Sequence, residues 1–360
     1  MKPLCFLLLF LSLPTLLFSQ QKNSAPVKAP LSAATAAAIQ TPEPKTPEEF
    51  FARARQLSDL EASGIPFHLK ATYVASGHTE FIGHGTFEEW FQSKDVWREE
   101  VKLGSYRWVA VKNGKKSAAS ATSEYIPLRV RQIQYLQILH LALLKETHSE
   151  WKISPQPVGA TPIGTVAAEL PCDPRTKKIL CIQQYEFGAD GGLRSYRDND
   201  VTEMYGDFQP FGKLLFPRRI VVTLRAKPID TATIVTLEAL VRNNRKLFDV
   251  TEIPNLGTVP PGLIGVSPAQ RVKSPKLIYS AQLKDQKHER KLHPLNVVVV
   301  ECTIGTNGEV REPFVQRSAG RKFDEPALEA VQSATFKPGK EKGRPVLVEE
   351  MLVILFQSPP

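Results

Sequence analysis

The chain has 360 residues, with 46 lysines and arginines against 37 aspartates and glutamates, and a formal net charge of +9 at pH 7. Its length suits two domains and a linker, and its 42% hydrophobic and 23% charged residues are typical of a globular protein. The basic residues are spread along the chain and no RNP, zinc-finger or helix-turn-helix pattern occurs, which argues against nucleic-acid binding. They indicate a solvated basic surface, with weak attraction to anionic lipid headgroups as the alternative.

Residues 1–19 have the pattern of a secretory signal peptide. Lys2 precedes an apolar run over residues 4–18, and a basic start followed by an apolar core is typical of such peptides. We predict cleavage at the end of this segment and a periplasmic mature protein. The alternative is an uncleaved inner-membrane anchor, for which the run is short and is interrupted by Pro14. Residues 20–45 are rich in proline, alanine and serine and are predicted to be a disordered tether.

Residues 46–250 have the pattern of a curved antiparallel sheet with helices. Thr46, Pro47 and Glu49 form a capping-box sequence that predicts the start of a helix. Apolar and polar residues then alternate in short segments between turns, as in a meander of strands, and a change of period predicts a helix over residues 126–145. The strands are predicted at residues 67–73, 81–91, 96–103, 106–111, 164–170, 179–187, 193–197, 214–224 and 233–241.

Trp90, Trp97 and Trp108 lie in this meander, where they either pack in the core or line an apolar cavity. The order of the elements resembles the half-barrel of the LolA-type lipoprotein carriers. That resemblance implies a concave apolar face able to take acyl chains, and it identifies no lipid-binding residue here. The segments that carry it are FHLKATY (67–73), WREEV (97–101) and LLFPRRI (214–220).

No set of residues predicts catalysis, a metal site or a cofactor. His78, Glu80 and His84 would lie on the same face of an extended strand, as metal ligands could. His84 lies too far along such a strand to complete a metal site with the other two. Asp198, Asp200 and Glu203 follow a Gly-Gly turn without the other positions of a calcium loop, so we expect a solvated turn there. Sequences typical of hydrolases, P-loops and dinucleotide-binding sites do not occur.

Three cysteines lie beyond the signal peptide. Cys172 and Cys181 flank a turn-like segment between two strand patterns, and in an oxidising compartment we expect them to form a disulfide. Closing so short a loop stabilises the fold by about 2–3 kcal/mol at most. Cys302 lies on the apolar parity of its strand and is expected to be a buried small hydrophobe.

Residues 251–273 combine prolines and glycines without a clear period and are predicted to be the interdomain linker. A small ββαβ domain is predicted over residues 274–357, so the fold class of the whole chain is α+β. Its first long strand closes at Asn307-Gly308, and Asn-Gly between alternating apolar residues is a strong hairpin signal. Asp324 is predicted to cap a helix, and a final strand follows over residues 346–356.

This segment resembles a TonB C-terminal domain. Two departures are the absence of the glycine that usually opens the first long strand, and Ala334 where the family commonly has tryptophan. The resemblance implies that the domain recruits an extended peptide of an outer-membrane transporter. The segments that carry it are SPKLIYS (274–280), VVVVECTIGTNGEV (297–310), VQRSAG (315–320), FDEPALEAV (323–331), FKPG (336–339) and GRPVLVEEMLVILF (343–356).

The final strand is the predicted partner-binding surface. If it lies at a sheet edge, its unpaired N–H and C=O groups invite strand addition. A fully paired or covered strand, or a homodimer through it, is the alternative. We predict a non-catalytic, TonB-family adaptor of the cell envelope that binds an outer-membrane transporter or another envelope protein. The second hypothesis is a periplasmic lipid or lipoprotein carrier with a TonB-like docking module. The predicted partner-binding residues are Val346, Val348, Glu350, Leu352, Ile354 and Phe356.

Overall fold

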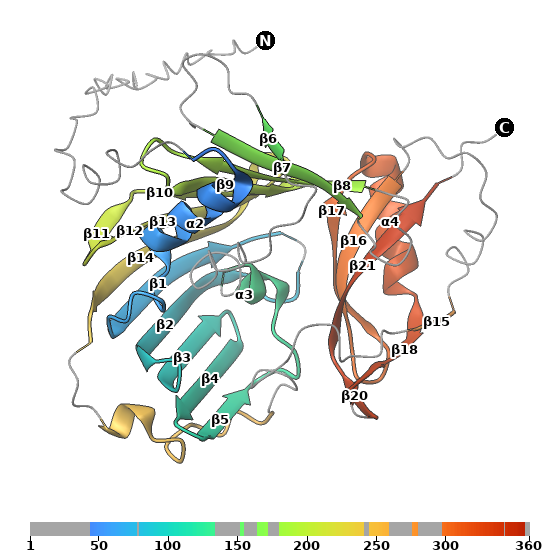
Figure 1. The fold of residues 1–360 in the computed structure, drawn as a ribbon. Helices are drawn as coiled ribbons and strands as arrows, with labels where there is room; N and C mark the ends of the chain where they lie inside the picture. The colour runs from blue at the N-terminus through green and yellow to red at the C-terminus, as the bar shows by residue number, and fades with distance from the viewer. Residues whose placement is uncertain are drawn as a thin grey trace, which may run out of the picture.

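The computed structural model describes two units, each with its own hydrophobic core (Figure 1). We call the described residues from 44 to 258 the curved-sheet domain, and those from 276 to 356 the C-terminal module. The described residues are 44–77, 79–133, 152–154, 164–171, 180–240, 245–258, 276–279, 297–341 and 343–356.

A 12-stranded antiparallel sheet forms most of the curved-sheet domain, which confirms the predicted fold class. Its strand order is β5-β4-β3-β2-β1-β14-β13-β10-β9-β8-β7-β6, so the first strand and the last pair at its centre. The two-stranded β11–β12 hairpin stands apart. The strands are β1 (Phe67–Ala75), β2 (Gly83–Ser93), β3 (Val96–Leu103), β4 (Tyr106–Asn113), β5 (Lys116–Ala121), β6 (Lys152–Ser154), β7 (Gly164–Pro171), β8 (Leu180–Phe187), β9 (Leu193–Asp198), β10 (Val201–Gly206), β11 (Gln209–Phe211), β12 (Leu214–Phe216), β13 (Arg219–Leu224) and β14 (Lys227–Ala239).

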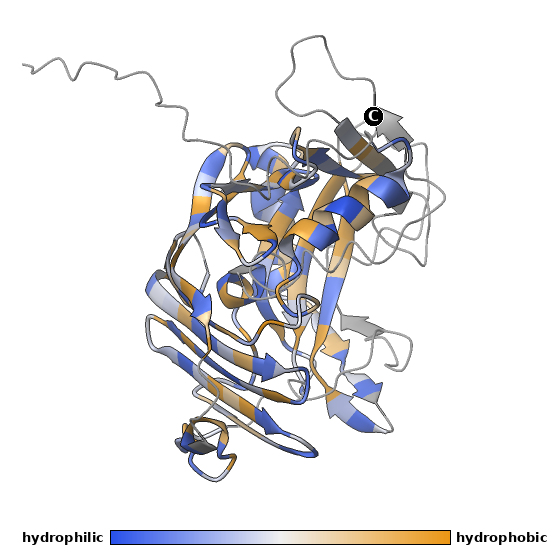
Figure 2. Ribbon diagram, turned by 60° about the vertical axis from the view of Figure 1, so that its left-hand side comes forward, coloured by the Kyte–Doolittle hydropathy of each residue, from blue (hydrophilic) through white to orange (hydrophobic). Residues whose placement is uncertain are grey.

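The concave side of the sheet carries the main core. Helix α2 (Pro47–Ser58) lies against it in Figure 1. The predicted capping box is present, with the Thr46 hydroxyl accepting a hydrogen bond from the Glu49 amide. Phe51 packs edge-on against Tyr185 at 5.1 Å between ring centroids. Figure 2 shows hydrophobic and hydrophilic residues alternating along the strands, as expected where one face of a sheet is buried.

The chain that follows β14 returns along the outer face of the sheet. The 3-10 helix η3 (Arg245–Phe248) places Phe248 against Val109 and Val111 of β4. Thr258 then forms an isolated antiparallel bridge with Ala121. The described beginning of the predicted linker is therefore packed on the curved-sheet domain, because its apolar residues cover apolar side chains on the outer face.

The C-terminal module is built on a three-stranded sheet of order β17-β16-β21, with helix α4 (Arg321–Gln332) against one face. The turn between β16 and β17 contains Gly308 at φ 87°, as the Asn-Gly signal predicts. A Cβ atom at Gly308 would stand 1.7 Å from the Phe336 carbonyl oxygen, so only glycine fits there. The strands are β15 (Lys276–Tyr279), β16 (Val297–Ile304), β17 (Val310–Arg317), β18 (Thr335–Lys337), β19 (Gly339–Glu341), β20 (Arg344–Val346) and β21 (Val348–Leu355).

Helix α4 begins earlier than predicted. Its N-cap is Gly320, without a side-chain cap, and Pro326 lies inside the helix. Asp324 is in the first turn, where its carboxylate accepts hydrogen bonds from the Ser318 hydroxyl and the Ala319 amide. The prediction of Asp324 as the N-cap was wrong because its side chain secures the preceding loop instead of starting the helix.

Two further predictions for the curved-sheet domain were wrong. Glu203 lies inside β10 and is 1% exposed, so the expected solvated turn is a hairpin, whose loop is at Asn199 and Asp200. The predicted strand over residues 214–224 is two strands interrupted at Pro217, because proline cannot donate a ladder hydrogen bond. Of the helix predicted over residues 126–145, the structure describes α3 (Leu128–Ile133), and the rest lies outside the described residues.

Candidate functional site

The predicted partner-binding strand lies at the edge of the module's sheet. β21 pairs in antiparallel register with β16, from Val297 opposite Leu355 to Ile304 opposite Val348. Within the described part of the chain, β16 is its only strand neighbour. Of the predicted partner-binding residues, Val346 does not belong to β21, because the strand begins only at Val348. Val346 pairs instead with Gly339 in the β19–β20 hairpin.

Both faces of β21 are covered. Leu352, Ile354 and Phe356 point to the α4 side, where they pack with the module's core. On the opposite face, Val353 belongs to a cluster that includes Cys181 of the curved-sheet domain. Three of the six side chains predicted to bind a partner are thus packed within the chain. Among the described residues, no strand pairs with the outer backbone edge of β21.

The other edge strand, β17, is engaged by the curved-sheet domain. The Asp200 amide donates a hydrogen bond of 3.2 Å to the Gln316 carbonyl, and the Ser318 amide donates one of 2.8 Å to the Asp200 carboxylate. Near the start of β17, the Glu312 carboxylate accepts a hydrogen bond of 2.5 Å from the Leu128 amide. The β17 edge of the sheet is therefore hydrogen-bonded to the curved-sheet domain, and β21 forms the other edge.

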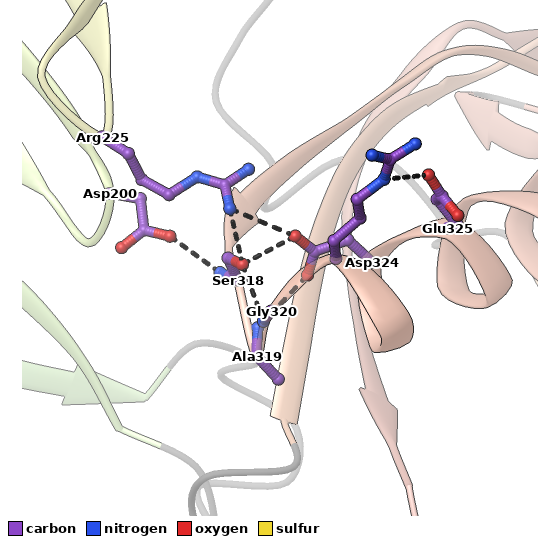
Figure 3. Close-up of polar contacts among 8 residues, drawn as sticks. Asp200, Arg225, Ser318, Ala319, Gly320, Asp324 and Glu325 are labelled. Carbon is purple, nitrogen blue, oxygen red and sulfur yellow. Dashed lines mark hydrogen bonds and ion pairs between the residues drawn. The ribbon is translucent and has the colours of Figure 1, made fainter.

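The Asp200 contact belongs to a polar cluster between the two units (Figure 3). Arg225, in the turn between β13 and β14, donates to the Ser318 hydroxyl at 2.9 Å and to Asp324 at 3.3 Å. Asp324 is 6% exposed, so its charge is partly removed from water and the arginine offsets that cost. We call this set of contacts the turn cluster.

A second polar cluster is centred on helix α3. Arg131, which is 7% exposed, donates to the Thr303 hydroxyl at 2.5 Å. Its guanidinium also lies 3.4 Å from the carboxylates of Glu301 on β16 and Glu349 on β21. The helix therefore contacts the edge strand itself. We call these contacts, with the bond from Leu128 to Glu312, the helix cluster.

Apolar packing connects the two clusters. Phe314 of β17 is 7% exposed and packs with Leu128, Val222 and Ile229 of the curved-sheet domain. The Arg129 guanidinium stands 5.1 Å from the centroid of the Phe314 ring, in cation–π contact. We call the turn cluster, the helix cluster and this packing together the seam.

Ionisable groups at the seam are perturbed by burial. Desolvation raises the pKa of Glu312, against the opposing effects of the Leu128 amide and the Arg131 charge. Burial lowers the pKa of Arg129. Burial, together with the negative charge of Glu301, raises the pKa of Asp198 to about 6. In each case the first cause is the burial of the group, which disfavours its charged form.

Other predictions are resolved in part. Cys302 is fully buried in the module's core, as predicted. Cys172 lies outside the described residues, so the disulfide with Cys181 stays a prediction. Trp108 is part of the concave core, and Trp97 packs against that core. Trp90 packs on the outer face of the sheet and lines no concave surface.

Among the described residues, no group of histidine, cysteine, aspartate and glutamate side chains is arranged to hold a metal ion. His78 lies outside them. In the same part of the chain, no helix has the length and apolar character needed to cross a membrane.

No pattern in the sequence identifies the seam residues. Arg131 lies in a pattern that predicts only an amphipathic helix, and Asp200 and Arg225 lie in turns where polar residues are ordinary. A weak signal was the pair Arg225-Ala226, which forms the hairpin loop between Leu224 and Lys227 without the usual asparagine or glycine.

Comparison with known proteins agrees with the resemblance found in the C-terminal segment. Residues 291–357 match the family described as Gram-negative bacterial TonB protein C-terminal. Among solved structures, the chain is similar to the crystal structure of a LolA superfamily protein from Nitrosomonas europaea. The two share 10% sequence identity with a TM-score of 0.34, over 57% of this chain and 98% of that one. No curated protein sequence matches this chain.

Proposed function

We propose that this protein is a non-catalytic adaptor of the cell envelope that binds an extended segment of a partner along the outer edge of β21. The observation that carries the proposal is the difference between the two edges of the module's sheet. Among the described residues each edge strand pairs with β16 alone, but β17 also accepts a backbone hydrogen bond at its Gln316 carbonyl from the Asp200 amide of the other unit. An edge strand of this kind is a template for an added strand.

The surroundings of the edge favour a partner over uncontrolled aggregation. Glu349 on β21 has a side chain that is 61% exposed, and a charge on an edge strand opposes pairing with apolar chains. An added strand with a basic residue opposite Glu349 gains a favourable cross-strand pair. The match to the TonB family supports an outer-membrane transporter as the partner and the periplasm as the location. A second copy of this chain is the competing occupant of the same edge.

Photo-crosslinking in intact cells tests the proposal. A photoreactive amino acid replaces Glu349 on β21 and, as the matched control, Glu329, an exposed residue of α4. The Glu349 side chain is 61% exposed, and Arg131 keeps its contacts with Thr303 and Glu301 when Glu349 is replaced, so we expect the fold to be preserved. We expect Glu349, and not Glu329, to capture an outer-membrane protein that mass spectrometry identifies as a transporter. Capture of this chain alone from Glu349, or equal yields from both sites, refutes the proposal.

A lipid or lipoprotein carrier is the second candidate, favoured by the apolar concave face of the curved sheet. Phe67, Leu69 and Ala71 alternate along β1 on that face and are 0% exposed. Because they are fully buried, an acyl chain has to displace the side chains that cover them. Mass spectrometry of the purified protein under non-denaturing conditions tests this role. Retained lipid favours it, and a protein that stays lipid-free after exposure to lipid vesicles argues against it.

A further inference from the structure

We infer that the C-terminal module is a releasable cap that closes one end of the curved sheet and separates from it while both units stay folded. This goes beyond the proposed strand addition and does not depend on it, because it rests only on the seam.

The seam lies at a single end of the curved sheet. Cys181 is near the start of β8, and Asp200 lies in the β9–β10 turn. Arg225 lies in the β13–β14 turn, and Val201 pairs with Leu224 beside that turn. In an antiparallel sheet these strand starts and turns share one end, so the module covers the end of the sheet rather than its outer face. Figure 1 shows β7 and β8 reaching toward β16 and β17 there.

The composition of the seam differs from that of the two cores. Its hydrogen bonds join charged groups on turns and on a short helix, whereas each unit keeps a separate apolar core. Three buried polar atoms of seam residues have no hydrogen-bond partner within the described part of the chain, namely Nε of Arg129, Oε1 of Glu312 and Oε1 of Gln316. Buried polar atoms without partners cost free energy. When the units separate, water can hydrogen-bond these atoms, so opening removes the free-energy cost of burying them.

Backbone strain is concentrated at the same place. Five non-glycine residues in the described part of the chain have positive φ, and four of them belong to the seam or its turns. Asn199 is at φ 54°, Arg225 at 50°, Ala226 at 63° and Glu312 at 45°. Such conformations cost free energy in residues with a Cβ atom and persist where contacts impose them. Turn geometry favours positive φ at Arg225 and Ala226, which form the two-residue loop of the β13–β14 hairpin, and Glu312 lies at a register shift between β16 and β17. The seam is therefore built on strained turns and an irregular strand segment.

Opening the seam uncovers apolar surface on both sides. On the module it exposes the sheet face opposite α4, where Val297 and Val299 are 1% and 0% exposed, together with Phe314. On the curved-sheet domain it exposes Val222 and Ile229, at the end of the concave side. The cap therefore controls access to that end. Arg131 connects it to β21 through Glu349, so the state of the edge strand and the state of the cap influence one another.

Hydrogen exchange at single residues in the full-length protein tests the inference. The amides of Ser318 and Leu128 bond across the seam, to Asp200 and Glu312. The Phe336 amide bonds within the module, to the Gly308 carbonyl, and serves as the reference for a folded module. After correction for intrinsic rates, we expect both seam amides to exchange at least about tenfold faster than that of Phe336, because release precedes unfolding. The amide of Ile234, bonded to the Arg218 carbonyl within the curved-sheet domain, gives the second reference.

A pair of arginine variants adds a matched comparison. Arg131→Gln removes the charge that joins α3 to the module, whereas Arg321→Gln breaks an exposed pair with Glu325 inside α4. We expect Arg131→Gln to raise exchange of the Ser318 and Leu128 amides about tenfold and to leave Phe336 unchanged. Arg321→Gln should change none of them. Equal protection of all four amides, or an equal effect of Arg131→Gln on seam and reference amides, refutes a releasable cap.

Discussion

Truncation of Phe314 isolates the apolar part of the seam. The ring projects from β17, yet its described apolar neighbours, Leu128, Val222 and Ile229, all belong to the curved-sheet domain. The Phe314→Ala variant therefore removes contacts between the units and leaves the module's own core intact. The substitution should therefore weaken the docking of the module on the curved-sheet domain and leave the folding of each unit unchanged.

The magnitude follows from burial and from the arginine above the ring. Phe314 is 7% exposed, and burying a phenylalanine side chain contributes about 2–3 kcal/mol. The cation–π contact with Arg129, whose guanidinium is desolvated, adds about 1 kcal/mol. The sum, about 3–4 kcal/mol, lies within the usual range for a Phe→Ala substitution in a core. It corresponds to a shift of two to three orders of magnitude in the docking equilibrium.

Hydrogen exchange separates docking from unfolding in this variant. We expect Phe314→Ala to raise the exchange rate of the Ser318 amide by about two orders of magnitude or more, while the Phe336 amide changes less than about tenfold. Phe336→Ala is the matched control, because Phe336 is 5% exposed within the module's own core. That control should increase exchange throughout the module. If Phe314→Ala acts on both amides equally, the ring stabilises the module itself and the reasoning fails.

Two further substitutions test the packing. Gly308→Ala should destabilise the module by several kcal/mol, because its Cβ atom meets the Phe336 carbonyl oxygen, whereas Gly343→Ala has open space and should cost only about 1–2 kcal/mol for its positive φ. Thermal unfolding compares the two variants, and equal losses contradict the steric argument. Burial raises the pKa of Glu203 to about 8 despite a hydrogen bond from the Tyr205 hydroxyl. The native state therefore binds the proton more tightly than the unfolded state, and the free energy of unfolding falls as pH rises toward 8, by up to about 1.4 kcal/mol per unit. Glu203→Gln should reduce this slope in urea titrations from pH 5 to 8, to which Asp198 and Asp230, whose pKa values burial also raises, contribute with the same sign, and an unchanged slope shows that Glu203 is not responsible.

Local signals in the sequence determined much of the secondary structure. The capping box at Thr46 and the turn at Gly308 are properties of a few adjacent residues, and both form as predicted. Alternation of apolar and polar residues likewise identified most of the long strands, because a strand with one buried face repeats every two residues. The burial of Cys302 followed from the same parity.

Predictions failed where distant segments decide the environment. Glu203 looks like a turn residue in sequence, but it is buried in β10 because β13 supplies its neighbour, Val222. Asp324 looks like a helix cap, but its carboxylate holds the loop at Ser318 and contacts Arg225, a residue 99 positions away. No local pattern contains these partners.

The same distinction applies to the candidate site. The sequence by itself determined that the chain ends in a strand of apolar residues with acidic residues near its start, and that this strand belongs to a TonB-like module. Only the tertiary structure decided which edge strand of the module's sheet bonds to the other unit through its backbone. That contact is the hydrogen bond from the Asp200 amide to the Gln316 carbonyl of β17. An edge is a property of the whole sheet, since it exists only where no other segment pairs.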